Sequence, residues 1–587
     1  MIDEKEVREI AMAYALLNAV QHGGKASLGA VMGKVMAEKP EWRRVARSIV
    51  GIVRSVVEEV NKLSLEEQKR LLEERYSWVL EKARKPRTEE KRLPPLPNAA
   101  EGKVVTRFAP NPDFLIHIGN ARPAILSHEY ARMYKGKFIL RFEDTDPRTK
   151  TPIIEAYAAI REDLRWLGLS WDEEYIQSLR MEIYYRVARE LIEKGGAYVD
   201  DQPAEVFRKY RDENRLAEYP PRRRSVEENL ELWDKMLEGR FGEGEAVLRV
   251  KTDPDHPDPS VRDWVAFRII DTSRTPHPLV GDRYTVWPTY NFAAAVDDHL
   301  MGVTHILRAK EHMQNTVKQK YLYRHMGWEY PTVIHFGRLK LEGFIMSKSA
   351  LKKLLEEGVF LGLDDPRFGT IAGLRRRGIT AEAIRRVILD VGVKGTDASI
   401  SYANLAAINR SIVDARARRF LVVFDPVEMV IEGLPRDYEI TIPYHPERRE
   451  MGARSIKLPA GTAKVLVSKR DAASFKPGML VRLVEAFNVE VVEVGGSVRA
   501  RFAGESLEDA RRRGAPIIHW VPVSDENVNV IVYKPEGLRL EVLQGIGEPS
   551  LRGVDRGEIV QFLREGFYRI DGVAKEQGEV VAIYSHD

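Results

Sequence analysis

The segment Arg107-Phe108-Ala109-Pro110-Asn111-Pro112-Asp113-Phe114-Leu115-Ile116-His117-Ile118-Gly119-Asn120-Ala121-Arg122 joins two different patterns. The apolar run 104–108 predicts a strand, and an amphipathic helical pattern follows to about Tyr134. A loop between a strand and a helix of an open α/β sheet is where such sheets bind ligands. We expect the helix start to offer unpaired N–H groups and a positive dipole end, Gly119 to admit a nucleotide, and His117 to donate to phosphate.

The alternation of strand and helix patterns continues along the chain. Residues 138–142 predict the next strand and residues 153–167 the next helix, and the pattern extends to about Arg410. Alternation of this kind indicates βαβ units on a parallel sheet. Between residues 197 and 284 prolines interrupt the pattern, which predicts an inserted domain.

The two ends of the chain differ from this middle part. Apolar residues at helical spacing predict a small helical module in the first hundred residues, closed by a proline-rich, charged linker at 85–97. After Asp425 the spacing changes to period two, and short strands with regular turns predict a barrel or a sandwich.

Composition limits the function classes. The 587 residues are 44% hydrophobic and carry a formal charge of +4, so contact with nucleic acid has to come from local basic patches. The absence of cysteine excludes disulfides, thiolate nucleophiles, iron–sulfur clusters and Cys-ligated zinc. Because the first residues are charged and no apolar run reaches about 18 residues, we expect a soluble cytoplasmic protein without a membrane segment.

A second segment carries chemistry far downstream. Gly343-Phe344-Ile345-Met346-Ser347-Lys348-Ser349 follows the apolar strand pattern 333–341 and precedes a helix that begins near Leu351. Small hydroxyl residues around one lysine make a loop that can bring a cation onto leaving phosphates. In this order, and each at a strand end, the two segments resemble the two signature sequences of class I aminoacyl-tRNA synthetases.

Further motifs narrow the resemblance. Together with the first segment, Leu140-Arg141-Phe142-Glu143-Asp144-Thr145-Asp146-Pro147-Arg148 is similar to the glutamyl-tRNA synthetase core, as are residues 288–299 and 301–308. The resemblance covers about residues 100–410. The β-rich remainder resembles the anticodon-binding barrels of archaeal glutamyl and of glutaminyl enzymes, and the N-terminal helices fit the archaeal type.

The resemblance implies a multidomain α/β plus all-β architecture. It comprises an N-terminal helical module with its linker, a Rossmann-like catalytic domain in two halves, an insertion for the tRNA acceptor end, a helical connector and a β-barrel anticodon-binding region. The expected boundaries, in the order of the chain, are 1–95 for the module, 96–196 for the first catalytic half, 197–284 for the insertion, 285–350 for the second half, 351–420 for the connector and 421–587 for the barrel region.

Glutamate differs from glutamine by one charge, so its pocket has to supply a cation that glutamine would leave buried and unpaired. By resemblance, Arg107 and Arg308 face the substrate side-chain carboxylate, with Tyr290 alongside, and Glu143 accepts hydrogen bonds from the α-ammonium group. Glutaminyl enzymes lack the arginine at the place of Arg308, and this position favours glutamate.

The resemblance also implies an ATP site and a two-step reaction. Glutamate attacks the α-phosphate of ATP, and the acyl group then passes to the terminal ribose of tRNA; activation is expected to require bound tRNA. Mg²⁺ bridges the phosphates, and no protein metal site is expected at Asp144 or Asp146, which we predict to fix their loop. His117, Asn120 and Lys348 are the predicted catalytic residues. The predicted ATP contacts are Pro110, Asn111, Pro112, His117, Ile118, Gly119, Asn120, Met346, Ser347, Lys348 and Ser349.

Three positions depart from the family pattern: Asn120, Ile345 and Phe114. The nearest alternative is a glutaminyl-tRNA synthetase; a non-catalytic tRNA-binding paralogue and a nucleotidyltransferase are others. We expect a monomer that charges tRNA-Glu, and the sequence leaves open whether it also charges tRNA-Gln. Candidate phosphate contacts are the arginine clusters 222–224, 375–377, 410 with 416, 418 and 419, and 511–513.

Overall fold

The computed structural model describes residues 3–21, 24–79, 93–344, 351, 353, 356 and 361–587. The chain divides into two compact units, Met1–Arg92 and Leu93–Asp587.

The first unit is helical, as its periodicity predicts. Buried Leu16, Val53 and Val56 belong to its own apolar core. A capping box between Ser64 and Glu67 starts the helix at Leu65, because each side chain satisfies a backbone N–H that the helix leaves unpaired. The elements are α1 Glu4–Gln21, α2 Leu28–Glu38, η1 Pro40–Val45, α3 Ala46–Val60 and α4 Leu65–Arg75.

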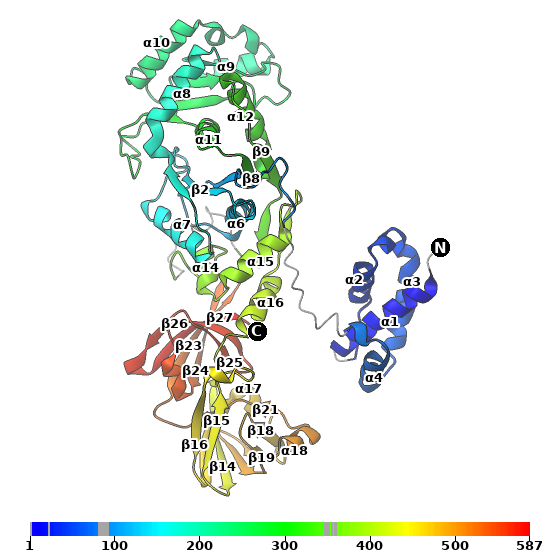
Figure 1. Cartoon of the computed structure of the whole chain (residues 1–587). Helices are drawn as coiled ribbons and strands as arrows, with labels where there is room; N and C mark the ends of the chain where they lie inside the picture. Colours follow the sequence, from blue (N-terminus) through cyan, green and yellow to red (C-terminus); the bar gives the residue numbers. More distant parts are fainter. Residues whose placement is uncertain are drawn as a thin grey trace. The chain divides into compact units, whose positions relative to one another are not determined.

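Parallel strands form the centre of the second unit (Figure 1). Strands β1 (Val105–Phe108), β2 (Lys137–Phe142) and β3 (Glu173–Ile176) pair in parallel in that order, connected by α6 (Ile118–Met133) and α7 (Ile154–Trp166). Strand β8 (His305–Ala309) pairs in parallel with β9 (Thr332–Phe336). The N–H of Thr304 donates to the carbonyl of Val105 at 3.0 Å, which places β8 on the other side of β1 from β2.

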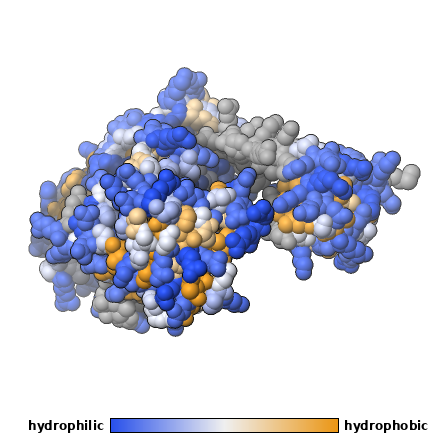
Figure 2. Space-filling model, turned by 90° about the horizontal axis from the view of Figure 1, so that it is seen from below, coloured by the Kyte–Doolittle hydropathy of each residue, from blue (hydrophilic) through white to orange (hydrophobic). Residues whose placement is uncertain are grey.

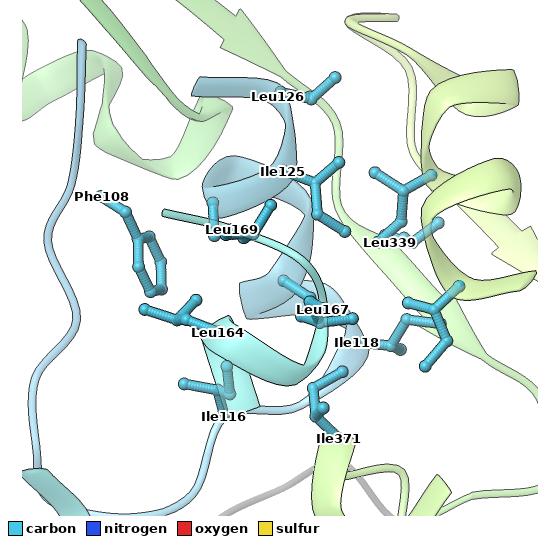
Figure 3. Packing of buried hydrophobic residues seen from close by; sticks show 14 of the residues in the cluster. Phe108, Ile116, Ile118, Ile125, Leu126, Leu164, Leu167, Leu169, Leu339 and Ile371 are labelled. Atoms are coloured by element: carbon cyan, nitrogen blue, oxygen red, sulfur yellow. The ribbon is translucent and has the colours of Figure 1, made fainter. Parts of the chain in front are cut away.

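Helix α6 is fixed by apolar side chains from several elements. Figure 3 shows Ile118 and Ile125 of α6 packed among Leu164 of α7, Leu339 and Ile371. All five are nearly or fully buried, which removes the helix's apolar face from water. This packing anchors the start of α6, where the first signature segment ends.

An antiparallel sheet of order β4-β5-β6-β7 lies where the sequence pattern breaks. The strands and helices that follow β3 up to Pro288 are η2 Gln177–Arg180, α8 Met181–Glu193, β4 Ala197–Asp200, α9 Ala204–Asp212, η3 Leu216–Glu218, η4 Pro220–Arg223, α10 Val226–Leu237, β5 Val247–Val250, β6 Val265–Ile269 and β7 Val286–Pro288. The chain then returns to the parallel strands through α11 Tyr290–Leu300, and η5 Lys310–His312 and α12 Met313–Met326 follow β8. Beyond β9 the elements are β10 Leu339–Leu341, α14 Ile371–Arg376, α15 Ala381–Val391, β11 Ala398–Ile400 and α16 Tyr402–Val413.

The remainder forms barrel-like sheets, as the period-two pattern predicts. One has the order β12-β25-β26-β27-β23-β24-β13 and another β21-β18-β19-β20-β14-β17-β22, with β15 and β16 as a hairpin. The strands are β12 Arg419–Phe420, β13 Val422–Phe424, β14 Pro426–Leu434, β15 Tyr438–Pro443, β16 Ala453–Leu458, β17 Gly461–Ser468, β18 Leu480–Leu483, β19 Asn488–Val494, β20 Val498–Phe502, β21 Ile517–Ile518, β22 Val521–Pro522, β23 Val528–Glu536, β24 Arg539–Gly547, β25 Ile559–Phe562, β26 Gly566–Ala574 and β27 Glu579–His586. Short helical turns lie between them: η6 Arg449–Met451, α17 Lys469–Ala472, α18 Leu507–Arg512, η7 Pro549–Gly553 and η8 Lys575–Gln577.

The face of the molecule that Figure 2 shows is largely hydrophilic, with hydrophobic residues scattered among polar ones. Across the described ranges, no helix is both long enough and apolar enough to cross a membrane.

Candidate functional site

A cavity of about 1130 Å³ lies at the carboxyl ends of β1 and β8. Its lining includes Arg107, Glu143, Tyr290 and Arg308, together with His117 at the start of α6. Strand β1 has β2 on one side and β8 on the other, and open α/β sheets bind ligands at the point where neighbouring strands diverge in this way. Residues that are far apart in the sequence therefore meet in one site.

Arg107 is part of a buried network of charges. Its Nε donates to Asp298 Oδ1 at 3.1 Å, and Arg141 Nη1 donates to the same oxygen at 2.8 Å. Arg141 Nη2 donates to Glu143 Oε1 at 2.9 Å. Two guanidinium groups thus face two carboxylates. Burial opposes the ionised form of Asp298, but Arg107 and Arg141 hold its pKa below the usual range.

Arg308 has a different environment. The residue is 5% exposed, and its guanidinium donates only to neutral acceptors among the described residues. These acceptors are Tyr290 Oη at 3.3 Å, Thr316 Oγ1 at 2.7 Å, Gln319 Oε1 at 3.0 Å and Tyr330 Oη at 3.1 Å. No carboxylate lies within ion-pair distance of Arg308 in the part of the chain that the structure describes. Burial opposes its charged form, but the neighbouring tyrosines and the more distant Asp298 raise the pKa of Arg308. A buried cation without a counter-ion is costly, and a bound carboxylate would offset that cost.

His117 caps α6 with its own ring. Its Nδ1 accepts hydrogen bonds from the N–H groups of Gly119 at 3.0 Å and Asn120 at 3.3 Å. Burial lowers the pKa of His117 to about 4, so the ring is neutral at pH 7. Since Nδ1 accepts, the ring proton of the neutral form lies on Nε2, where it is available as a donor in the cavity.

The prediction of unpaired N–H groups at this helix start is wrong. Ile118 N–H donates to the carbonyl of Gly369, Gly119 and Asn120 donate to the His117 ring, and Ala121 donates to the carbonyl of His117. These backbone donors are satisfied within the protein, because the His117 ring and carbonyl and the carbonyl of Gly369, which precedes α14, accept their hydrogen bonds. The imidazole and the helix dipole remain for an anion.

The structure explains why position 119 requires glycine, which the sequence alone did not. A Cβ at this position would lie 2.8 Å from Cε1 and 2.9 Å from Nδ1 of His117, and 3.2 Å from the carbonyl oxygen of Leu339. The absence of a side chain therefore makes room for the His117 ring.

The remaining predicted ATP contacts differ in their placement. Pro110, Asn111 and Asn120 line the cavity, and the buried Asn111 Oδ1 has no hydrogen-bond partner within the described structure. The side chain of Ile118 instead lies in the apolar core, and Pro112 is buried away from the cavity lining. Ile118 packs in the core because it begins the buried face of α6. Met346, Ser347, Lys348 and Ser349, with the departure Ile345, lie outside the described residues.

Phe114, the unexplained departure, lines the cavity and packs with Leu351 and Phe368. Its aromatic ring therefore contacts the chain just after the second signature, at Leu351.

The acidic residues near the site fix its loops. Asp144 accepts hydrogen bonds from Tyr157 Oη at 2.6 Å and from Ser178 Oγ at 2.7 Å. Asp146 pairs with Arg268 at 2.8 Å and accepts from the N–H of Thr149. Among the residues that the structure describes, no three His, Cys, Asp or Glu side chains are grouped to hold a metal ion.

Most arginines of the predicted basic clusters are engaged within the protein. Arg376, for example, joins α14 to Asp571 of β26 at 2.7 Å. The other ion pairs are Arg222–Asp263, Arg224–Asp201, Arg375–Glu162, Arg416–Glu382, Arg418–Glu558, Arg419–Asp414 and Arg512–Asp509. The clusters therefore hold elements together as well as carrying positive charge.

Comparison with known families agrees with this architecture. The family described as "tRNA synthetases class I (E and Q), catalytic domain" matches residues 103–415. Two families described as "tRNA synthetases class I (E and Q), anti-codon binding domain" match residues 417–503 and 517–571. The chain belongs to the class I tRNA synthetases of the E and Q type.

Relatives of this synthetase extend over nearly the whole chain. A protein of Hyperthermus butylicus named Glutamate--tRNA ligase is 66% identical over 580 residues, covering 97% of this chain and 100% of the relative. Proteins with the same name from Pyrobaculum calidifontis and Aeropyrum pernix are 54% and 55% identical, each covering 99% of this chain and 100% and 99% of their own lengths.

Sequence reasoning missed several residues of the synthetase's site. Asp298 lies within the segment 288–299 that resembles the family core, but only the tertiary structure shows that it pairs with Arg107 and Arg141. Thr316 and Gln319 are polar residues three positions apart on the buried face of α12. The available signal for these two residues was that they interrupt the apolar face of a helix soon after Arg308.

Proposed function

We propose that this synthetase activates L-glutamate with ATP and transfers it to the 3′-terminal ribose of tRNA-Glu. The observation that carries the proposal is Arg308, a buried guanidinium with only neutral partners among the described residues, in the same cavity as Arg107 and His117. A carboxylate side chain would complete this site, whereas a carboxamide would leave the cation unpaired. The relatives named Glutamate--tRNA ligase support the same choice.

In the proposed pose, the substrate side-chain carboxylate lies against Arg308 and Arg107, with the Tyr290 hydroxyl beside it. Glu143 accepts from the α-ammonium group. An α-carboxylate oxygen then attacks the α-phosphorus of ATP, the bond to the bridging oxygen breaks, and pyrophosphate leaves. In the second step the terminal ribose hydroxyl attacks the acyl carbon, and AMP leaves. Positioning and charge neutralisation account for such chemistry without a covalent enzyme intermediate.

The ATP phosphates are proposed to lie against His117 Nε2–H, Asn120 and Lys348. Met346, Ser347 and Ser349 would contribute contacts from the same loop as Lys348, and Asn111 and Pro110 would line the nucleotide site. Of the acids that line the cavity, Glu143, Asp146 and Glu311 are each engaged by an arginine. Mg²⁺ would therefore arrive with the triphosphate, where it neutralises phosphate charge.

The finer architecture is part of the proposal. The domains are residues 1–95, 96–196, 197–284, 285–350, 351–420 and 421–587, in the roles that the resemblance implies, with a Rossmann-like core interrupted by the acceptor-end insertion. The antiparallel sheet β4–β7 and the barrel-like sheets support this layout. In the proposal the synthetase acts as a monomer that charges tRNA-Glu, and experiment decides whether it also charges tRNA-Gln.

The test is pyrophosphate exchange in the presence of tRNA, with glutamate and with glutamine. Exchange with glutamate, and little with glutamine, is expected; the reverse preference would refute the proposal. Lys348→Ala should slow exchange on the order of a hundredfold while leaving tRNA binding nearly intact, because its contact is to the leaving phosphates. Charging of purified tRNA-Glu and tRNA-Gln with labelled glutamate decides the tRNA range.

A further inference from the structure

The side chains around Arg308 orient it without neutralising it. Nη2 of Arg308 donates to Thr316, Gln319 and Tyr330, and Nη1 donates to Tyr290. A hydroxyl or an amide oxygen accepts a hydrogen bond from a guanidinium but leaves its formal charge in place. Arg107, by contrast, already has Asp298 as its counter-ion.

Gln319 is the centre of this arrangement. It is fully buried on α12, and its Oε1 accepts from Arg308 Nη2 at 3.0 Å and from Tyr330 Oη at 2.7 Å. Its Nε2 is buried and has no hydrogen-bond partner among the described residues. Among the described residues, therefore, only the oxygen of this amide forms hydrogen bonds. A Glu side chain at position 319 would also supply that oxygen.

We propose that Gln319 is a specificity-determining positioning residue: it fixes the direction of the Arg308 guanidinium and, by being neutral, keeps that charge for the carboxylate of the amino-acid substrate. This inference rests on the proposed function. It assigns the discrimination between glutamate and glutamine jointly to Arg308 and to the neutrality of the residue behind it.

Gln319→Glu separates charge from shape. The substitution keeps the oxygen that Arg308 and Tyr330 contact, replaces the nitrogen without a partner, and places a negative charge about 3.0 Å from Arg308. A buried ion pair with good geometry is better compensated than a lone buried cation, so the variant should fold. Gln319→Met removes the acceptor without adding charge. Gln314→Glu is the matched control, because it adds the same charge at an exposed position of α12.

The experiment measures KM and kcat for glutamate in tRNA-dependent pyrophosphate exchange, the ratio of kcat/KM for glutamate to that for glutamine, and the thermal midpoint without amino acid. For Gln319→Glu we expect the glutamate KM to rise by about tenfold or more with a smaller change in kcat, because the substrate and the introduced carboxylate would compete for one guanidinium. The glutamate preference should fall, the ATP KM should stay unchanged, and the midpoint should not fall.

Gln319→Met should raise the glutamate KM yet keep the preference for glutamate, and Gln314→Glu should behave like the wild type. An unchanged glutamate KM and preference in Gln319→Glu would overturn the inference, as would an equal loss of preference in Gln319→Met. Failure of the proposed function is a separate result, since the wild-type chain would then not exchange pyrophosphate with glutamate.

Discussion

Arg107 and Arg308 occupy equivalent places, each next to the last residue of its strand, yet among the described residues only Arg107 has a carboxylate partner. Both are 5% exposed and line the same cavity. This difference in counter-ions gives the two arginines different effects on stability and on binding of a carboxylate. Arg107 forms a direct ion pair in the folded core, whereas Arg308 has no carboxylate within ion-pair distance among the described residues.

Substituting the two arginines should therefore change stability in opposite directions. Arg107→Met leaves Asp298 with Arg141 alone and should lower the free energy of unfolding by about 2 kcal/mol. Arg308→Met removes a buried cation that has no direct ion pair among the described residues, and it should raise the thermal midpoint. Both variants should lose glutamate activation, by about a hundredfold or more. Thermal unfolding and pyrophosphate exchange measure these effects; equal destabilisation by the two substitutions would contradict the assignment.

His117 combines two tasks that substitutions can separate. His117→Ala removes the acceptor for the Gly119 and Asn120 N–H groups, which should cost about 1 kcal/mol of stability. It also removes the Nε2–H donor, with a loss of exchange on the order of a hundredfold. His117→Asn can restore the helix cap but not the donor in the cavity. Recovery of the thermal midpoint without recovery of the rate is expected, and recovery of both would argue against phosphate contact.

Gly119→Ala should inactivate through displacement of a neighbouring ring. The added Cβ would lie within 3 Å of the His117 imidazole, so the ring has to leave its capping position. We expect exchange to fall as far as in His117→Ala. Gly51→Ala is the control, since nothing lies within 4 Å of a Cβ at that exposed position of α3. It should gain up to about 1 kcal/mol of stability from helix propensity and keep full activity.

Asp163 makes stability depend on pH. Burial raises the pKa of Asp163 to about 7, and its Oδ2 has no hydrogen-bond partner in the described part of the chain. Between about pH 4 and 7 the folded chain holds a proton that the unfolded chain has released, so this carboxyl makes the free energy of unfolding fall as pH rises.

Asp163→Asn removes that dependence. Its gain over the wild type should be small near pH 4, should grow by about 1.4 kcal/mol for each further pH unit up to about pH 7, and should then level off. Thermal midpoints at several pH values measure it, with Glu155→Gln on the exposed start of α7 as the control. A gain that is the same at about pH 4 and about pH 8 would exclude a titrating Asp163.

Local pattern was enough to predict β1, α6, β2 and α7, because each depends on residues within one short window. The resemblance at Arg107 and Arg308 predicted a shared site, and the structure places both in one cavity. The prediction for the N–H groups of α6 failed, since the partners of Ile118 and Gly119 are a distant carbonyl and a ring that folds back. The periodicity of apolar residues in the sequence cannot predict hydrogen-bond partners of that kind.

The amino-acid sequence by itself determined the strand and helix pattern of the core and, through the family resemblance, that Arg107 and Arg308 belong to one cavity. Only the tertiary structure decided which of the two is neutralised, because Asp298 comes from α11 and Gln319 from α12, each brought to its arginine by packing. The sequence gives the type of each ionisable side chain. The effect of its charge depends on its distance from other charges and on its burial, and the folded chain sets both.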